Sequence, residues 1–119
     1  MNFVILRGHL SSEPQERVLA SGSVLWSLEL TTPTDQGAWS VPVAWFDPPS
    51  SVPFCAGDEV VVVGAVRRRF FRGAAGTQSR TEVVASEIVA ASARRKVDRM
   101  LQRQVDRLGA QLGGALRSV

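Results

Sequence analysis

Alternation of apolar and polar side chains dominates the first ninety residues. Val24, Trp26, Leu28 and Leu30 alternate with a more polar set, and successive side chains of a strand point to opposite faces, so this run predicts a strand with one buried face. Similar runs over residues 3–10, 39–45, 60–71 and 81–90 are separated by turn residues. Five short strands without a long helix predict a small all-β barrel or sandwich.

Two residues mark unusual positions in these strands. Gly8 interrupts the first apolar run, which predicts a bulge or a close backbone contact. Pro42 lies inside the third run. Proline has no N–H to donate to a sheet, so we expect an edge or a bulge there.

The stretch Gly64 to Val84 predicts a long hairpin that turns at Gly73 and Gly76. The period of two places Arg67, Arg69 and Phe71 on one face and Arg68 and Phe70 on the other. Arginine neutralises phosphate and an aromatic ring stacks on an unpaired base, so this face is typical of a site for single-stranded nucleic acid. Further arginines at positions 72 and 80 strengthen the hypothesis, and Phe70 is assigned to packing.

Residues 93–117 predict a helix. Leucine and valine repeat at spacings of three and four and form a short apolar seam made of Leu101, Val105, Leu108 and Leu112. Basic residues occupy the opposite face: Lys96, Arg99, Arg103 and Arg107. We therefore expect the seam to pack on another subunit or protein while the basic stripe faces nucleic acid.

Composition and charge narrow the function classes. The chain is 45% apolar and has no run of about eighteen apolar residues, so we expect a soluble protein without a membrane partner. Its first residues do not resemble a signal peptide, which favours the cytoplasm. His9 and Cys55 each stand alone. The expectation is therefore no metal, no cofactor and no enzymatic activity.

The net charge of +3 is unevenly distributed. Up to residue 91 there are seven Arg against nine Asp and Glu, or −2, and from residue 92 there are seven Arg and Lys against two Asp, or +5. The two sums give the total of +3. An anion site on the first ninety residues must therefore be built locally by the hairpin arginines.

Several motifs resemble those of the bacterial single-stranded DNA-binding protein family. The segment N-F-V-I-L-R-G-H-L is similar to the family's N-x-V-I-L-x-G-x-L, and E-P-Q-E-R, Ser21-Gly22, G-A-V-R-R-R-F-F and R-T-E-V-V match later landmarks in the same order. The resemblance covers residues 2–90. It implies a five-stranded OB-fold barrel over residues 1–91, followed here by a C-terminal amphipathic helix over residues 92–119.

The resemblance also implies site residues. Trp39, Trp45 and Phe71 match positions where the family presents stacking rings, and Arg67 and Arg69 match basic positions beside them. The two tryptophans are equally compatible with the core or a subunit interface. The family assembles from several copies, commonly a tetramer, and ends in an acidic peptide that recruits other proteins. This chain ends A-L-R-S-V instead, which departs from the family's pattern.

These observations together favour binding of single-stranded DNA with little sequence preference, in DNA replication, recombination or repair. The expected location is the cytoplasm, associated with the nucleoid, with replication or repair proteins as further partners. RNA is an open alternative, because stacking and phosphate contacts do not report the 2′-hydroxyl. The competing hypothesis is an OB-fold adaptor between proteins, in which DNA binding is secondary.

Overall fold

The computed structural model describes residues 1–49 and 52–117, and only the backbone of residues 114–117. The predicted tail boundary at residue 119 lies outside them. In chain order the elements are β1 (Val4–Leu10), β2 (Gln15–Val18), β3 (Val24–Thr34), β4 (Gly37–Phe46), β5 (Glu59–Gly73), β6 (Gly76–Ala90) and α1 (Arg94–Arg117). The five predicted strands and the C-terminal helix are confirmed.

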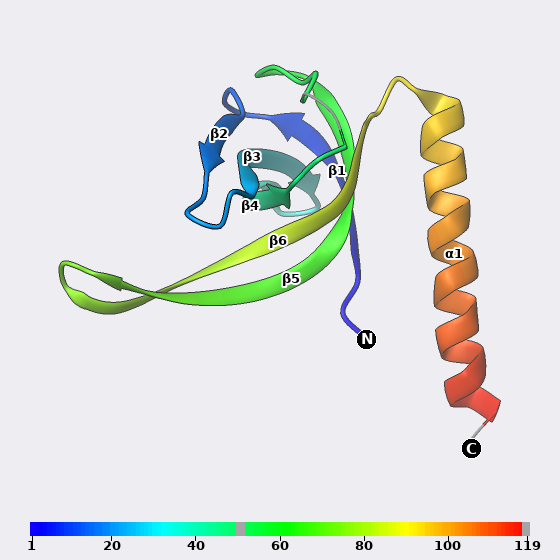
Figure 1. The fold of residues 1–119 in the computed structure, drawn as a ribbon. Coiled ribbons are helices and arrows are strands. Elements are labelled where there is room, and N and C mark those ends of the chain that lie inside the picture. The colour runs from blue at the N-terminus through cyan, green and yellow to red at the C-terminus, as the bar shows by residue number, and fades with distance from the viewer. Residues whose placement is uncertain (50–51, 118–119) are drawn as a thin grey trace.

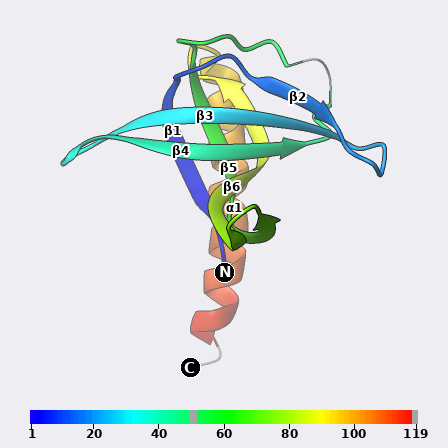
Figure 2. The same ribbon diagram turned by 90° about the vertical axis from the view of Figure 1, so that its left-hand side faces the viewer.

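Five strands close into a barrel. Their order is β1-β5-β6-β4-β3, and pairing of β1 with β3 joins the two ends. Only β4 and β6 run parallel; the other pairs are antiparallel. This closed arrangement with one C-terminal helix is an OB-fold-like architecture (Figures 1 and 2).

A sixth strand lies outside the barrel. The polar segment around Gln15 was expected to be a turn, and that expectation was wrong. Residues Gln15–Val18 form β2, which pairs antiparallel with the first half of β3. All four of its side chains are exposed. A strand without a buried face has no apolar alternation, and this explains why the pattern did not reveal it.

The barrel interior is filled by the inward side chains of all five strands. Leu10, Leu30, Val60 and Val62 are almost completely buried and form one cluster with the remaining core residues. Inward residues of β5 alternate with Val61 and Val63, which face outward yet are also buried. The helix α1 covers this outward pair, so the continuous valine run of β5 is explained by burial on both faces.

Glycine is required at two places where backbones meet. A Cβ built on Gly8 would lie 2.2 Å from the Thr31 carbonyl oxygen, and one on Gly64 would lie 2.2 Å from the Val84 carbonyl oxygen. The close contact predicted for Gly8 is therefore confirmed. Pro42 directly precedes the two β4 residues that pair with β6, so its side of β4 is an open edge, as expected.

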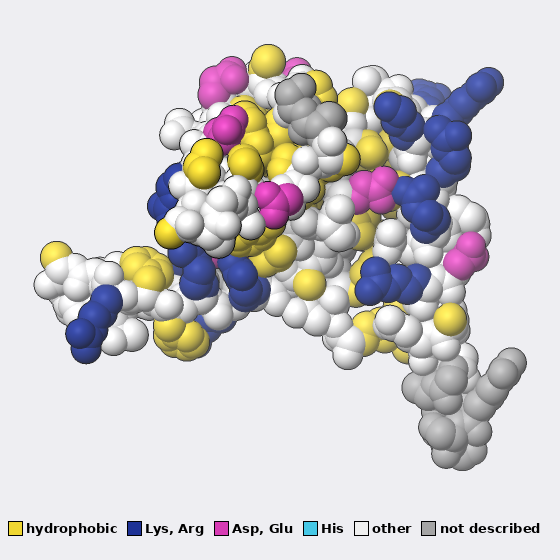
Figure 3. Space-filling model, in the orientation of Figure 1, with side chains coloured by type: hydrophobic (Ala, Val, Ile, Leu, Met, Phe, Trp, Pro, Cys, Tyr) yellow, Lys and Arg dark blue, Asp and Glu magenta, His cyan; other side chains and the backbone are white. Residues whose placement is uncertain are grey.

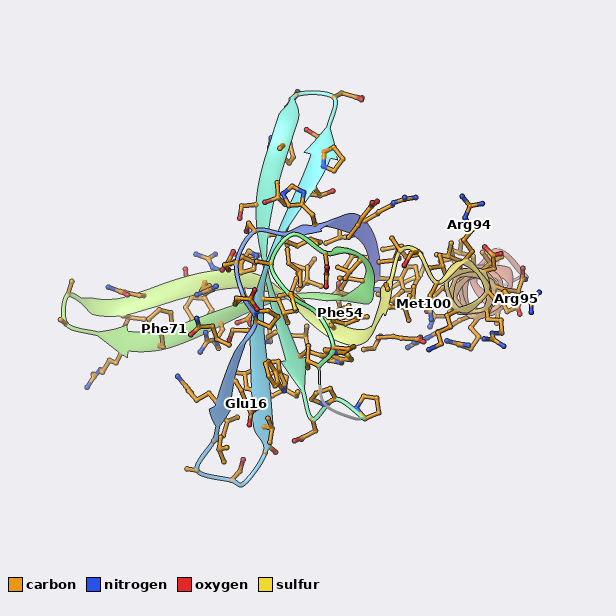
Figure 4. The ribbon with its side chains drawn as sticks, turned by 90° about the horizontal axis from the view of Figure 1, so that it is seen from above. Glu16, Phe54, Phe71, Arg94, Arg95 and Met100 are labelled. Atoms are coloured by element: carbon orange, nitrogen blue, oxygen red, sulfur yellow. The ribbon has the colours of Figure 1, made fainter. Side chains whose placement is uncertain are left out.

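The β5–β6 hairpin continues beyond the barrel as a two-stranded arm. We use "the arm" for Arg67–Gly73 and Gly76–Glu82, which pair only with each other. A two-residue turn joins Gly73 to Gly76, whose φ is +103°. Asn2 supports the base of the arm, because its side-chain amide both donates to the Val66 carbonyl and accepts from the Val66 N–H. Figure 4 shows the arm and α1 on opposite sides of the barrel.

The helix α1 docks on the outward side of β5 and β6. Met100 is fully buried against Val61 and Val63, and Val97 packs beside it; Figure 4 places Met100 between helix and barrel. The Arg103 guanidinium donates to both carboxylate oxygens of Glu87 on β6, at 2.6 and 2.9 Å. No helix in the described part of the chain is long and apolar enough to cross a membrane.

Candidate nucleic-acid interface

Strand register assigns the side chains of the arm to two faces. Directly paired residues of neighbouring strands point to the same side of a sheet, and the side alternates along each strand. Arg67 pairs with Glu82, Arg69 with Arg80, and Phe71 with Gln78. These six residues share the side that faces out of the barrel, which we call the outward face. The predicted grouping of Arg67, Arg69 and Phe71 is thus present, and Arg80 joins it from β6.

Buried Glu82 organises two of these arginines. Its side chain is only 6% exposed. The Arg69 Nε–H donates to Glu82 Oε1 at 2.9 Å, and an Arg67 guanidinium nitrogen lies 3.7 Å from the same oxygen. Both arginine side chains stay partly accessible, at 42% exposed for Arg67 and 44% for Arg69. One carboxylate therefore holds two cations at the protein surface.

A second carboxylate holds Arg80. Its guanidinium donates to Glu29 Oε1 on β3 at 3.0 Å, and both side chains are roughly half exposed. This ion pair ties the arm to the neighbouring barrel strand. The three arginines of the outward face and the two carboxylates that pair with them, Glu82 and Glu29, together carry a net charge of +1.

Aromatic rings lie beneath two of the arginines. The guanidinium carbon of Arg67 is 5.4 Å from the centre of the Phe46 ring, and that of Arg69 is 5.5 Å from the centre of the Phe71 ring. Such stacking restrains a long side chain while leaving its N–H groups free to donate. Phe71 is 39% exposed, so part of its ring is available to another planar group.

The outward face continues across the barrel strands. Register places Phe46 of β4 beside Leu25 of β3, and Leu25 beside Arg17 of β2. In Figure 3, Lys and Arg side chains gather where the arm leaves the barrel, with hydrophobic side chains among them. Sequence reasoning missed Phe46 and Arg17 because their position depends on pairing between distant strands. Leu25 is out of phase with the core residues Leu28 and Leu30 of β3, and this phase was the signal in the sequence that Leu25 faces away from the core.

Trp45 is not part of this face. It is 7% exposed and belongs to the barrel core, so its assignment as a stacking residue was wrong. Trp45 and Trp39 do share a strand face, as predicted, but that face points inward. The second half of β4 lies over the core, whereas its first half extends past the barrel with β3.

Trp39 and Arg72 lie on the opposite side from Phe71. Trp39 is 55% exposed and is in phase with the buried Val43, and Arg72 alternates with Phe71 along β5. Phe70, which was assigned to packing, is 65% exposed and stacks with Arg68 at 5.2 Å on that opposite side. The structure therefore leaves four of the seven residues predicted to bind DNA on the outward face: Arg67, Arg69, Phe71 and Arg80.

The predicted seam of α1 is displaced from the residues that dock. Val97, Met100 and Gln104 face the barrel, and Gln104 is 8% exposed with its Oε1 unpaired among described atoms. Val105 and Leu112 are exposed, and Leu101 and Leu108 are half-buried. The first turns of α1 thus pack on their own barrel, which the seam did not predict.

Models of known protein families and the curated proteins contain no match to this chain. What the outward face can bind is therefore inferred from its own side chains. This face offers guanidinium donors at a spacing set by the strands and a partly exposed ring. Such a surface suits an extended, flexible polyanion with planar groups better than a small molecule.

Proposed function

We propose that the protein binds single-stranded nucleic acid, with DNA as the expected form, along the outward face of the arm and the adjoining barrel strands. The single observation that carries the proposal is the row formed by Arg67, Arg69 and Phe71, in which two partly exposed arginines share a strand face with one partly exposed ring and the nearer arginine, Arg69, stacks on that ring. The arginines contact phosphates and the ring stacks on a base.

The arrangement supports little sequence preference. Stacking accepts any base, because every base has a π-face, and phosphates carry no sequence information. Glu82 keeps the two guanidinium groups ordered before any ligand arrives, which lowers the entropy that binding must remove. Participation in replication, recombination or repair belongs to the same proposal, as does assembly from several copies that would link several such faces.

Neighbouring phenylalanines provide the sharpest test. Phe71→Ala removes the ring from the outward face, whereas Phe70→Ala removes an identical ring from the opposite side, one residue away in the same strand. The affinity for oligo-dT is measured by fluorescence anisotropy of a labelled strand, with a duplex of equal length as the comparison. Circular dichroism of both variants checks that the barrel is intact.

We expect Phe71→Ala to cost about 1–3 kcal/mol, or roughly 5- to 150-fold in Kd. Phe70→Ala should change Kd by less than about twofold, and wild type should prefer the single strand. The reverse pattern would move the site to the opposite side of the arm, where Phe70 adjoins Arg68 and Arg72. Absence of binding by wild type at low salt would refute the proposal and favour the adaptor hypothesis.

A further inference from the structure

Basic residues of α1 follow the course of β6. Lys96 lines a depression together with Val89 and Ala90, near the end of β6. About two turns further along α1, Arg103 pairs with Glu87. Because α1 runs antiparallel to β6, its successive basic side chains meet successively earlier residues of that strand.

Arg107 reaches the part of β6 that leads into the arm. It lines a depression with Val84, Ser86 and Ala65. Val84 and Ala65 are paired and point outward, and the next outward residues along the two strands are Glu82 and Arg67. Along each strand this next outward residue lies about 7 Å further on, at the base of the arm.

The cations of α1 and of the arm consequently lie in line along one side of a single strand pair. From helix to arm the order is Lys96, Arg103, Arg107, Arg67, Arg69 and Arg80. Figure 3 shows Lys and Arg along the helix and again at the base of the arm, with uncharged surface and a few acidic side chains between them. The three carboxylates that pair with members of this row are Glu87, Glu82 and Glu29. Six positive and three negative charges leave +3.

We propose that a single strand bound at the arm continues along β6 onto this basic side of α1, so that the helix lengthens the binding site. The proposal rests on the function proposed above. Within the described part of the chain, Lys96, Arg99 and Arg107 have no acidic partner within 4.0 Å, whereas four of the five arginine ion pairs involve the barrel or the arm alone. These three cations are therefore not held in ion pairs within the described residues, and phosphate groups would supply the complementary charge.

The test separates the two parts of the site by strand length. Lys96→Gln/Arg107→Gln removes two cations from the row beside β6. Arg95→Gln is the control, because Arg95 points away from the barrel (Figure 4). Kd is measured against salt for an oligo-dT of about 8 nucleotides, which the arm and barrel can hold, and for one of about 30, since one OB fold contacts about 4–16.

With the long strand, we expect the double substitution to reduce the slope of log K against log salt by about 1.4, since each phosphate contact on a single strand contributes about 0.7. The slope with the short strand should be unchanged, and Arg95→Gln should change neither. A double substitution that affects both lengths equally, or no more than the control does, would overturn the helix path.

The outcomes also distinguish this inference from the function on which it rests. If wild type binds and Phe71→Ala weakens both strands while the double substitution weakens neither, only the helix path fails. If wild type binds neither strand, the proposed function fails first. Circular dichroism at 222 nm, a wavelength dominated by helix, checks that α1 keeps its structure in each variant.

Discussion

Replacing Glu82 by glutamine separates two opposing roles of this carboxylate. Glu82 holds Arg67 and Arg69 in place, and it also cancels part of their charge before a phosphate can use it. Glutamine has nearly the same shape and keeps an acceptor oxygen for the Arg69 Nε–H. Glu82→Gln therefore removes the negative charge while it preserves most of the geometry.

The cost in stability follows from the two contacts. A hydrogen bond to a charged group contributes about 1.5–3 kcal/mol. Here the arginine partners are nearly half exposed, and water replaces much of the lost attraction, so we expect a loss of about 1 kcal/mol. For a domain of this size that corresponds to a decrease in Tm of about 4–8 °C.

The gain in affinity follows from Coulomb's law. A carboxylate about 6 Å from a bound phosphate repels it by roughly 0.7 kcal/mol in water and more near a protein surface. Its removal should strengthen binding of oligo-dT about threefold to tenfold at low salt. The slope of log K against log salt should become steeper by about 0.7, because one more phosphate is neutralised.

The assay is an anisotropy titration at several salt concentrations, with thermal unfolding measured in parallel. Glu16→Gln is the control for net charge. Glu16 lies on the exposed strand β2 (Figure 4) and is paired with Trp26, so its side chain is on the opposite side of the sheet from the outward face. If both variants strengthen binding equally, Glu82 has no local effect and the reasoning is refuted. Weaker binding by Glu82→Gln with an unchanged barrel would show that positioning of the arginines outweighs their charge.

Three further substitutions test packing. Met100→Ala should weaken docking of α1 on the barrel by about 2–5 kcal/mol, because removal of a fully buried side chain leaves a cavity. Amide hydrogen exchange should therefore accelerate in α1 far more than in β3. Equal acceleration in both would contradict the packing of Met100 with Val61 and Val63 as a cluster apart from the barrel core. Gly64→Ala should destabilise the barrel in urea, since its Cβ would lie 2.2 Å from the Val84 oxygen; normal stability would show that the strands can separate. Gly109→Ala should stabilise α1 by about 1 kcal/mol, as nothing lies within 4 Å of the added Cβ; a loss of helix signal would contradict this.

The sequence by itself determined the elements whose two faces differ in polarity. The run from Val24 to Leu30 predicted a strand with one buried face, since a one-residue slip would expose Leu28 and Leu30. Gly8 signalled a close backbone contact, and the spacing of Arg67, Arg69 and Phe71 put them on one face of a hairpin. The helix over residues 93–117 was predicted from leucine and valine side chains that repeat at spacings of three and four.

Tertiary structure decided everything that depends on pairing between distant strands. Trp39 and Trp45 have the same periodicity, yet only Trp45 lies over the core, because β3 and β4 extend past the barrel at one end. Phe46 lies next to Arg67 only because β4 meets β6 at Val43 and Ala44, beside the base of the arm. Local periodicity states which side chains share a face, but only the closed barrel states whether that face meets the core, solvent or another strand.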